Sequence, residues 1–257
     1  MINKTGHKGD VYTCRNSHEG YLLASAGYDR SINIWEVFHE RCRNLTTMNG
    51  HNNAILQVCW SQDDTKLFSC SADKTISIWD VFESKRIKKM KGHEGFVNSI
   101  DITKKGTELV KKVIKKVVSG GDDNSIFLWD LRTKKHVLTE KFKFQVTTVA
   151  FNSTAETIFA GGIDNQIKIY DIRKRSTENV LIGHTDTITG LALSNDGNYL
   201  LSNSMDHSIR CWDIRPYVQG NRCIKVFHGA VHNFEKNLLR VCWSRDDSLI
   251  SAGSADR

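Results

Sequence analysis

The chain has 257 residues, a formal net charge of +7 and seven cysteines, an odd number that cannot pair completely. No hydrophobic run approaches the roughly 20 residues that span a membrane, and the first five residues lack the apolar core of a secretory signal. We therefore expect a soluble, unexported protein that makes no membrane contact and whose thiols are reduced and mostly buried.

The positive charge is concentrated in one segment. Residues 81–118 hold 11 Lys and Arg against 4 Asp and Glu, a balance of +7 that leaves the rest of the chain neutral. A protein that coats a nucleic acid spreads its basic residues more widely, so the pattern predicts one local contact with acidic protein or RNA.

Four residue types recur together along the chain. In the most regular copy, His, Ser, Asp and Trp are spaced by 18, 4 and 6 residues. The complete sets are His184, Ser202, Asp206 and Trp212; His7, Ser25, Asp29 and Trp35; His51, Ser69, Asp73 and Trp79; and, with a longer first interval, His93, Ser119, Asp123 and Trp129. A period of about 42 residues that ends in Trp-Asp predicts the four-stranded blade of a β-propeller.

In chain order, the repeats predict one all-β domain over residues 1–257, with antiparallel blades and under about a tenth of the residues in helix. A single proline, Pro216, and the absence of a low-complexity tract leave no candidate linker. The predicted repeats are about 6–40, 50–83, 92–133, 141–174, 183–216 and, beginning at Arg222 and truncated, 222–257.

The third repeat carries about eight extra residues, which we place in the segment Lys104–Val118 between its first two strands. Val110, Val113, Ile114 and Val117 recur at helical spacing with lysines between them, a pattern typical of a basic amphipathic helix. A longer, solvated hairpin is the alternative, since two or three helical turns are marginally stable without packing. Any contact with RNA is expected to be indirect or to pass through Lys111–Lys116.

The fourth repeat keeps Asp164 but has Phe142, Ala160 and Tyr170 where the other repeats have His, Ser and Trp. We expect the polar network to be absent from this blade and its core to be more apolar.

Serine, histidine and aspartate together also suggest a hydrolase, because a serine nucleophile needs an imidazole base and a carboxylate to orient it. Four copies at blade-building positions favour a buried network in which these groups satisfy one another. A metal site at His228 and His232 is disfavoured because Gly229 argues against a helix there. The sequence therefore predicts no enzyme, no catalytic, cofactor or metal site and no small-molecule substrate.

The remaining candidates are surface residues around one opening of the propeller. Positions near each Gly-His motif and each turn aspartate carry exposed aromatic and apolar side chains, which suit protein contacts; packing of the rim is the alternative for about half of them. The candidates for protein contact are Tyr12, Tyr28, Leu56, Phe96, Asp122, Ile163, Met205 and Phe234.

On these motifs the chain resembles the WD40 repeat family from Gly6 to Arg257. Within it, segments 203–206, 212–216 and especially 231–240 are similar to WD-repeat subunits of the spliceosomal U5 small nuclear ribonucleoprotein. The resemblance implies a seven-bladed, non-catalytic scaffold in the nucleus that docks on the large U5 protein subunits during pre-mRNA splicing. A WD40 substrate receptor of a ubiquitin ligase or a generic signalling adaptor is the alternative.

Six repeats begin and five reach the Trp-Asp position, so we expect these residues to form an incomplete ring of about five and a half blades. Such an arc exposes strand edges and an apolar blade face, and we expect it to be less soluble than a chain extended by the repeats that the resemblance implies.

Overall fold

The computed structural model describes residues 6–38, 42–103, 116–133, 135–218, 220–233 and 237–256. Within these ranges the regular structure is β-strand without α-helix, and no helix is long and apolar enough to cross a membrane. The predicted all-β fold is confirmed.

Five sheets of four antiparallel strands follow one another along the chain, and a two-stranded sheet comes last. The first three are β1 (Val11–Asn16), β2 (Leu22–Gly27), β3 (Ser31–Glu36) and β4 (Arg43–Asn49); β5 (Ile55–Trp60), β6 (Lys66–Ser71), β7 (Thr75–Asp80) and β8 (Lys85–Lys91); and β9 (Val97–Ile102), β10 (Lys116–Gly121), β11 (Ser125–Asp130) and β12 (His136–Lys141). The remaining sheets are β13 (Val146–Phe151), β14 (Thr157–Gly162), β15 (Gln166–Asp171) and β16 (Ser176–Ile182); β17 (Ile188–Leu193), β18 (Tyr199–Ser204), β19 (Ser208–Asp213) and β20 (Cys223–His228); and β21 (Val241–Trp243) with β22 (Ile250–Ala252).

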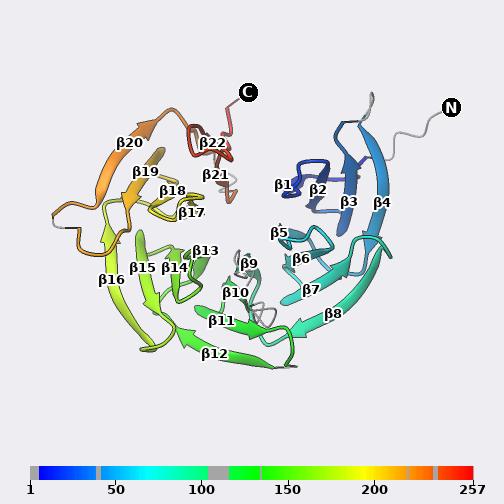
Figure 1. Ribbon diagram of the computed structural model, residues 1–257, viewed down its shortest axis with the longest axis horizontal. Helices are drawn as coiled ribbons and strands as arrows, with labels where there is room; N and C mark the ends of the chain where they lie inside the picture. Colours follow the sequence, from blue (N-terminus) through cyan, green and yellow to red (C-terminus); the bar gives the residue numbers. More distant parts are fainter. Residues whose placement is uncertain are drawn as a thin grey trace.

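Figure 1 shows these sheets arranged as blades around a common centre, with β1, β5, β9, β13 and β17 innermost and β4, β8, β12, β16 and β20 on the outer rim. The first and last sheets lie at the two ends of an open arc and are not hydrogen-bonded to each other in the part of the chain that the structure describes. The fold is a β-propeller arrangement of five blades and part of a sixth.

The hydrophobic core lies between successive blades. Ile32 and Ile34 of the first blade pack with Ile55, Val58 and Trp79 of the second, and each later pair of blades shares a similar cluster. Strands whose side chains are buried on both faces carry continuous apolar runs, as in the sandwiched central strands of each blade. Burial at roughly 25 cal/mol per Å² makes these interfaces the main stabilising contribution.

A bulge interrupts every outer strand opposite the aromatic residue that ends each repeat. Pairing skips a residue between Ile34 and Trp35, and between the equivalent residues of the other four blades. Bulges disturb the regular edge that another strand could extend. The outer edges of the blades are therefore protected against edge-to-edge association.

The predicted start of the sixth repeat at Arg222 is corrected by the pairing. Cys223–His228 forms β20, which pairs with β19 and completes the fifth blade. His228 therefore ends a strand and does not begin the loop that precedes β21. The spacing of the repeats located the inner strands, but the outer strand follows each Trp-Asp after a turn of variable length.

The expected burial of the cysteines was wrong for most of them. All seven are free, but only Cys70 and Cys211 are buried, whereas Cys14 and Cys42 are exposed. The two exposed thiols belong to the first blade, which packs against another sheet on one side in the described chain.

The basic insert of the third repeat falls largely on residues 104–115, which lie outside the described residues. β10 begins at Lys116, so Val117, which was included in the helical pattern, is a fully buried strand residue. The choice between a basic helix and a solvated hairpin over residues 104–115 stays a prediction.

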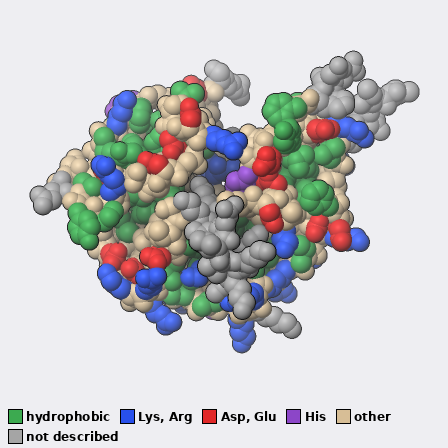
Figure 2. Space-filling view, in the orientation of Figure 1, with side chains coloured by type: hydrophobic (Ala, Val, Ile, Leu, Met, Phe, Trp, Pro, Cys, Tyr) green, Lys and Arg blue, Asp and Glu red, His purple; other side chains and the backbone are tan. Residues whose placement is uncertain are grey.

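Figure 2 shows hydrophobic side chains gathered over the first two blades, on the right of the view, and Lys and Arg side chains along the lower rim. β8, the outer strand of the second blade, carries five basic residues. Three of them are already engaged. Lys89 lies 3.4 Å from Asp73, Arg86 donates to the carbonyl of Gly50, and Lys88 donates to the carbonyls of Leu131 and Thr133.

Candidate protein-binding site

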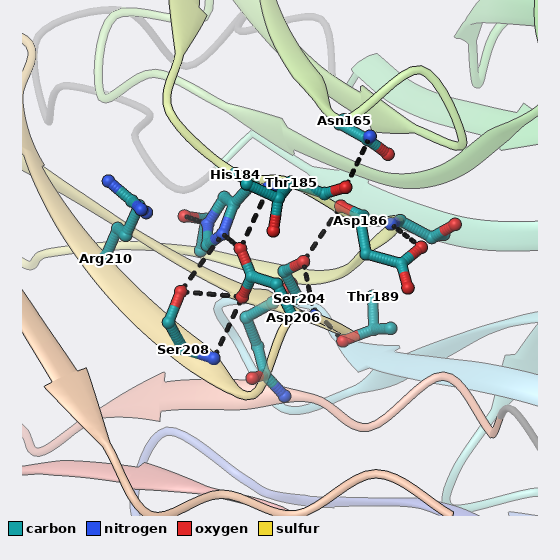
Figure 3. Close-up of polar contacts among 12 residues, drawn as sticks. Asn165, His184, Thr185, Asp186, Thr189, Ser204, Asp206, Ser208 and Arg210 are labelled. Atoms are coloured by element: carbon teal, nitrogen blue, oxygen red, sulfur yellow. Dashed lines mark hydrogen bonds and ion pairs between the residues drawn. The ribbon is translucent and has the colours of Figure 1, made fainter. Parts of the chain in front are cut away.

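The His, Ser, Asp and Trp side chains of the fifth blade form one hydrogen-bonded chain, and Figure 3 shows its His184 and Asp206 members. His184 Nδ1 lies 2.8 Å from Asp206 Oδ2, and His184 Nε2 lies 2.6 Å from Ser202 Oγ. Trp212 Nε1 donates to the same Ser202 oxygen at 2.8 Å. With Nδ1 donating to the carboxylate, Nε2 accepts the serine proton, so every polar group of the set has a partner.

The same chain of contacts occurs in the first three blades. The histidine to aspartate distances are 2.8, 3.0 and 2.7 Å, the histidine to serine distances are 2.7 Å in each, and the indole to serine distances are 2.8 Å in each. Four repeats of one sequence pattern thus give four copies of one geometry.

Each network joins a loop, a strand and a turn of its blade by hydrogen bonds. The histidine lies on the loop before the innermost strand, the serine on the next strand, and the aspartate on the turn that follows it. Asp206 also accepts hydrogen bonds from the backbone N–H groups of Thr185 and Ser208. Each carboxylate therefore fixes a loop and a turn that meet at the same face of the propeller.

The ionisation of the network follows from these contacts. Burial by itself would raise the pKa of Asp206, but hydrogen bonds from Ser208, His184 and the Thr185 N–H lower it to about 2. The pKa of Asp73 is lowered by the corresponding contacts against the same effect of burial. Burial lowers the pKa of His184, although Asp206 opposes this. At neutral pH the aspartate is charged and the histidine is neutral.

This arrangement does not suit nucleophilic catalysis. The side chains of Ser69, Ser119 and Ser202 belong to fully buried residues, and each oxygen also accepts the indole N–H. A nucleophilic oxygen has to reach a substrate carbon, which these oxygens cannot do. The geometry supports a structural role for the four sets.

The fourth blade replaces the network with a lysine. Lys168 Nζ lies 2.6 Å from Asp164 Oδ2 and 4.6 Å from the centre of the Phe142 ring. Tyr170 Oη donates to Glu140 at 3.3 Å. The expected loss of the His–Ser–Trp contacts is found, but Asp164 keeps a charged partner, so the blade is not simply more apolar.

Each blade brings two backbone positions together at one face of the propeller, and several of the predicted contact residues occupy these positions. In each blade the residue before the turn aspartate donates its N–H to a carbonyl just before the innermost strand. These pairs are Tyr28 with Asp10, Ala72 with Ala54, Asp122 with Phe96, Ile163 with Gln145, and Met205 with Thr187. Four of these pairs include a predicted contact residue, and in the pair of Asp122 with Phe96 both members are candidates.

Exposure divides the candidates into two groups. Tyr28, Phe96 and Ile163 are exposed, at 63%, 46% and 42%. The half-buried candidates are Tyr12, Leu56, Asp122 and Met205, and Phe234 lies outside the described residues. The exposed group is available to a partner, whereas the half-buried group packs the rim.

Three glycines shape this face. A Cβ at Gly27 would lie 1.9 Å from the carbonyl oxygen of Asp10, one at Gly121 would lie 2.4 Å from that of Phe96, and one at Gly162 would lie 2.4 Å from that of Gln145. Side chains cannot occupy those positions, so the glycines allow the turn and the innermost strand to approach closely.

Sequence reasoning missed several residues of this face. Val11 and Phe144 are exposed apolar side chains beside the predicted candidates, and neither falls on the repeat positions used for the prediction. Arg240, just before β21, was not selected because the adjoining loop has no counterpart in the other repeats. Among the described residues, no group of three His, Cys, Asp or Glu side chains could hold a metal ion.

A four-stranded blade that repeats five times, in four copies with a Trp-Asp ending and a buried polar network, defines a class of protein. The family model "WD domain, G-beta repeat" matches residues 2–36, 42–80, 84–130, 132–171 and 175–213. The chain belongs to the WD40 repeat family.

Within that family the chain is similar to proteins of the spliceosome. It is 47% identical over 253 residues to the U5 small nuclear ribonucleoprotein 40 kDa protein of Mus musculus, covering 98% of this chain and 68% of that protein. It is 46% identical to the protein of the same name from Homo sapiens, covering 98% and 69%. It is 40% identical to pre-mRNA-splicing factor cwf17 of Schizosaccharomyces pombe, covering 98% and 72%. The resemblance expected from the sequence is confirmed.

Proposed function

We propose that this chain is a non-catalytic WD40 scaffold of the U5 small nuclear ribonucleoprotein that binds proteins during pre-mRNA splicing in the nucleus. The observation that carries the proposal is the 46–47% identity over 98% of the chain to U5 40 kDa proteins. Identity at that level over nearly the whole chain supports a common fold and, we propose, a common assembly.

The exposed part of the rim supports protein binding. Tyr28, Phe96 and Ile163 present apolar side chains on three different blades of one face. Interfaces commonly centre on a few aromatic or aliphatic anchors surrounded by polar groups. The buried networks fix the loops that carry Tyr28 and Phe96, and the Lys168–Asp164 pair fixes the turn that follows Ile163. We propose the large U5 protein subunits as the partners of this face.

The test is affinity purification of the tagged chain from nuclear extract. Recovery of the large U5 subunits supports the proposal, whereas recovery of ubiquitin-ligase subunits, or of neither, contradicts it. A variant with Tyr28→Ala, Phe96→Ala and Ile163→Ala is expected to lose about tenfold or more of the recovered U5 proteins, because anchor residues dominate interface energies.

Phe82→Ala provides the matched control. Phe82 is 79% exposed and follows β7, at the opposite end of the blade from the rim. Its substitution removes a similar exposed aromatic without touching the proposed surface, so recovery is expected to equal that of the unsubstituted chain. An equal loss in both variants would place the contact elsewhere.

A further inference from the structure

Arg240 crosses the centre of the propeller. Its backbone lies just before β21 in the sixth blade, yet Nη2 donates to the carbonyl oxygen of Asn98 at 2.7 Å and Nη1 to that of Thr189 at 3.2 Å. Asn98 is on β9 of the third blade and Thr189 on β17 of the fifth. One guanidinium thus links three blades across the opening that the rim surrounds.

The approach of this segment depends on Gly190. A Cβ at position 190 would lie 3.0 Å from the carbonyl oxygen of Leu239 and 3.1 Å from the Cα of Arg240. The equivalent positions of the third and fourth blades hold Ser99 and Thr148, whose hydroxyls accept an N–H from the following blade. Because Gly190 has no side chain, the Arg240 backbone has room to lie against β17.

The charge of Arg240 is not balanced by the residues that hold it. Both acceptors are neutral carbonyls, and Nε is buried without a hydrogen-bond partner in the described part of the chain. Burial lowers the pKa of Arg240 to about 10, and no carboxylate among the described residues counteracts this. A cation held away from water without an anion is unfavourable.

Arg240 as a whole residue keeps part of its surface exposed, although its Nε atom is buried. Phe96, an exposed rim residue, lies two positions before Asn98 on the approach to β9. A segment anchored on the rim apolar residues would therefore pass close to an unbalanced cation.

We propose that Arg240 receives the carboxylate of an aspartate or glutamate side chain from a protein segment that docks on this rim. The inference rests on the proposed protein-binding function and names the chemistry of its partner. A guanidinium carries five N–H groups, of which two are engaged here, so a carboxylate can accept from the remaining ones. Motifs that carry phosphate are usually bound by clusters of arginine, whereas Arg15 is the one other arginine whose charge acts on Arg240 among the described residues.

The experiment compares three pools of fluorescently labelled hexapeptides that differ at one fixed position, which is Glu, Gln or phosphoserine. Fluorescence anisotropy is measured on the unsubstituted 257-residue chain and on the variants R240Q, R240K and K174Q. Lys174 lies in the turn before β16 and pairs with Glu178, so K174Q removes one positive charge far from the rim.

The Glu pool is expected to bind the unsubstituted chain about tenfold more tightly than the Gln pool, since hydrogen bonds to charged groups contribute most. R240Q should abolish that difference, K174Q should keep it, and R240K should keep part of it. Thermal melting of R240Q shows whether the variant is folded. Equal binding of the Glu and Gln pools, a preference that survives in R240Q, or tighter binding of the phosphoserine pool would overturn the proposal.

The peptide result is independent of the assembly that the chain joins. Failure to recover U5 proteins from extract contradicts the proposed function and leaves a Glu preference intact. Recovery of U5 proteins without a Glu preference contradicts the assignment of Arg240 alone.

Discussion

The second and fourth blades have the same four strands and the same Asp, but they satisfy its charge in different ways. In the second blade Asp73 is bound by His51, whose other nitrogen contacts Ser69, which also accepts from Trp79. In the fourth blade, Lys168 is the side chain that binds Asp164 among the described residues. The comparison teaches that the fold needs a partner for the turn aspartate, whereas the identity of that partner can change if the other members change with it.

The difference lies in how many groups depend on one another. Ser69 and Trp79 are almost fully buried, so loss of one member leaves a polar group without water. In the fourth blade Ala160 has no polar group to satisfy, and the ring of Phe142 packs against the Lys168 ammonium at 4.6 Å. The second blade should therefore be sensitive to single substitutions and the fourth blade tolerant of them.

The largest expected effect is in the second blade. Trp79→Phe or Asp73→Ala should lower the free energy of unfolding by about 1–3 kcal/mol, because each leaves buried partners unsatisfied. Chemical denaturation followed by fluorescence measures the loss. Trp79→Phe also removes packing, so Ser69→Ala serves as a second substitution that breaks the network with little change in volume.

A smaller loss is expected in the fourth blade. Tyr170→Phe removes a single hydrogen bond to Glu140 at 3.3 Å, which should cost under about 1 kcal/mol. Burial, with Glu140 adding to its effect, raises the pKa of Tyr170 to about 12, so the phenol stays neutral under the conditions of the measurement. Losses as large as those in the second blade would contradict the comparison.

Acid should weaken the network of the fifth blade, through His184 and Asp206. The folded pKa of His184 lies below its ordinary value of 6.5, so the unfolded chain binds the proton more readily. That contribution is present above pH 6.5 and is lost as the pH falls through the folded pKa. The low pKa of Asp206 adds a second loss between pH 3.8 and about 2.

The measurement is the free energy of unfolding from about pH 7 to about pH 5, the range in which histidine titrates. His184→Gln should be less stable at pH 7 and should show a shallower decline on acidification than the unsubstituted chain. A steeper decline in His184→Gln would mean that the histidine is protonated in the folded state.

The smallest effect is expected from the basic segment. Reversal of Lys111, Lys112, Lys115 and Lys116 to Glu should weaken binding of an acidic partner or RNA at low salt and matter little above about 0.5 M, where screening is strong. Binding measured across a salt series tests this. A loss that does not depend on salt would show that the substitutions disrupt the fold.

The repeated parts of the molecule could be predicted from the sequence because each position is set by local spacing. His184, Ser202, Asp206 and Trp212 meet since the strands between them have fixed lengths, and the same spacing locates the rim pairs such as Phe96 and Asp122. The β-propeller fold followed from this period.

The features that departed from the repeat could not be predicted in this way. Lys168, on the third strand of its blade, binds the turn aspartate that a histidine of the preceding loop binds in other blades. Arg240 contacts two blades that are distant from it in sequence. Both depend on where a long, flexible side chain ends in three dimensions, which spacing does not specify. The outer strand β20 was misplaced for a similar reason, since the turn before it varies in length between repeats.

The most direct test of the comparison is a pair of double-mutant cycles on the free energy of unfolding. One cycle combines Asp73→Asn with Trp79→Phe, and the other combines Asp164→Asn with Tyr170→Phe. Members of one buried network should show an interaction energy of about 0.5–3 kcal/mol, so the second-blade cycle should be non-additive and the fourth-blade cycle additive within error. Additivity in both blades, or equal coupling in both, would contradict the account.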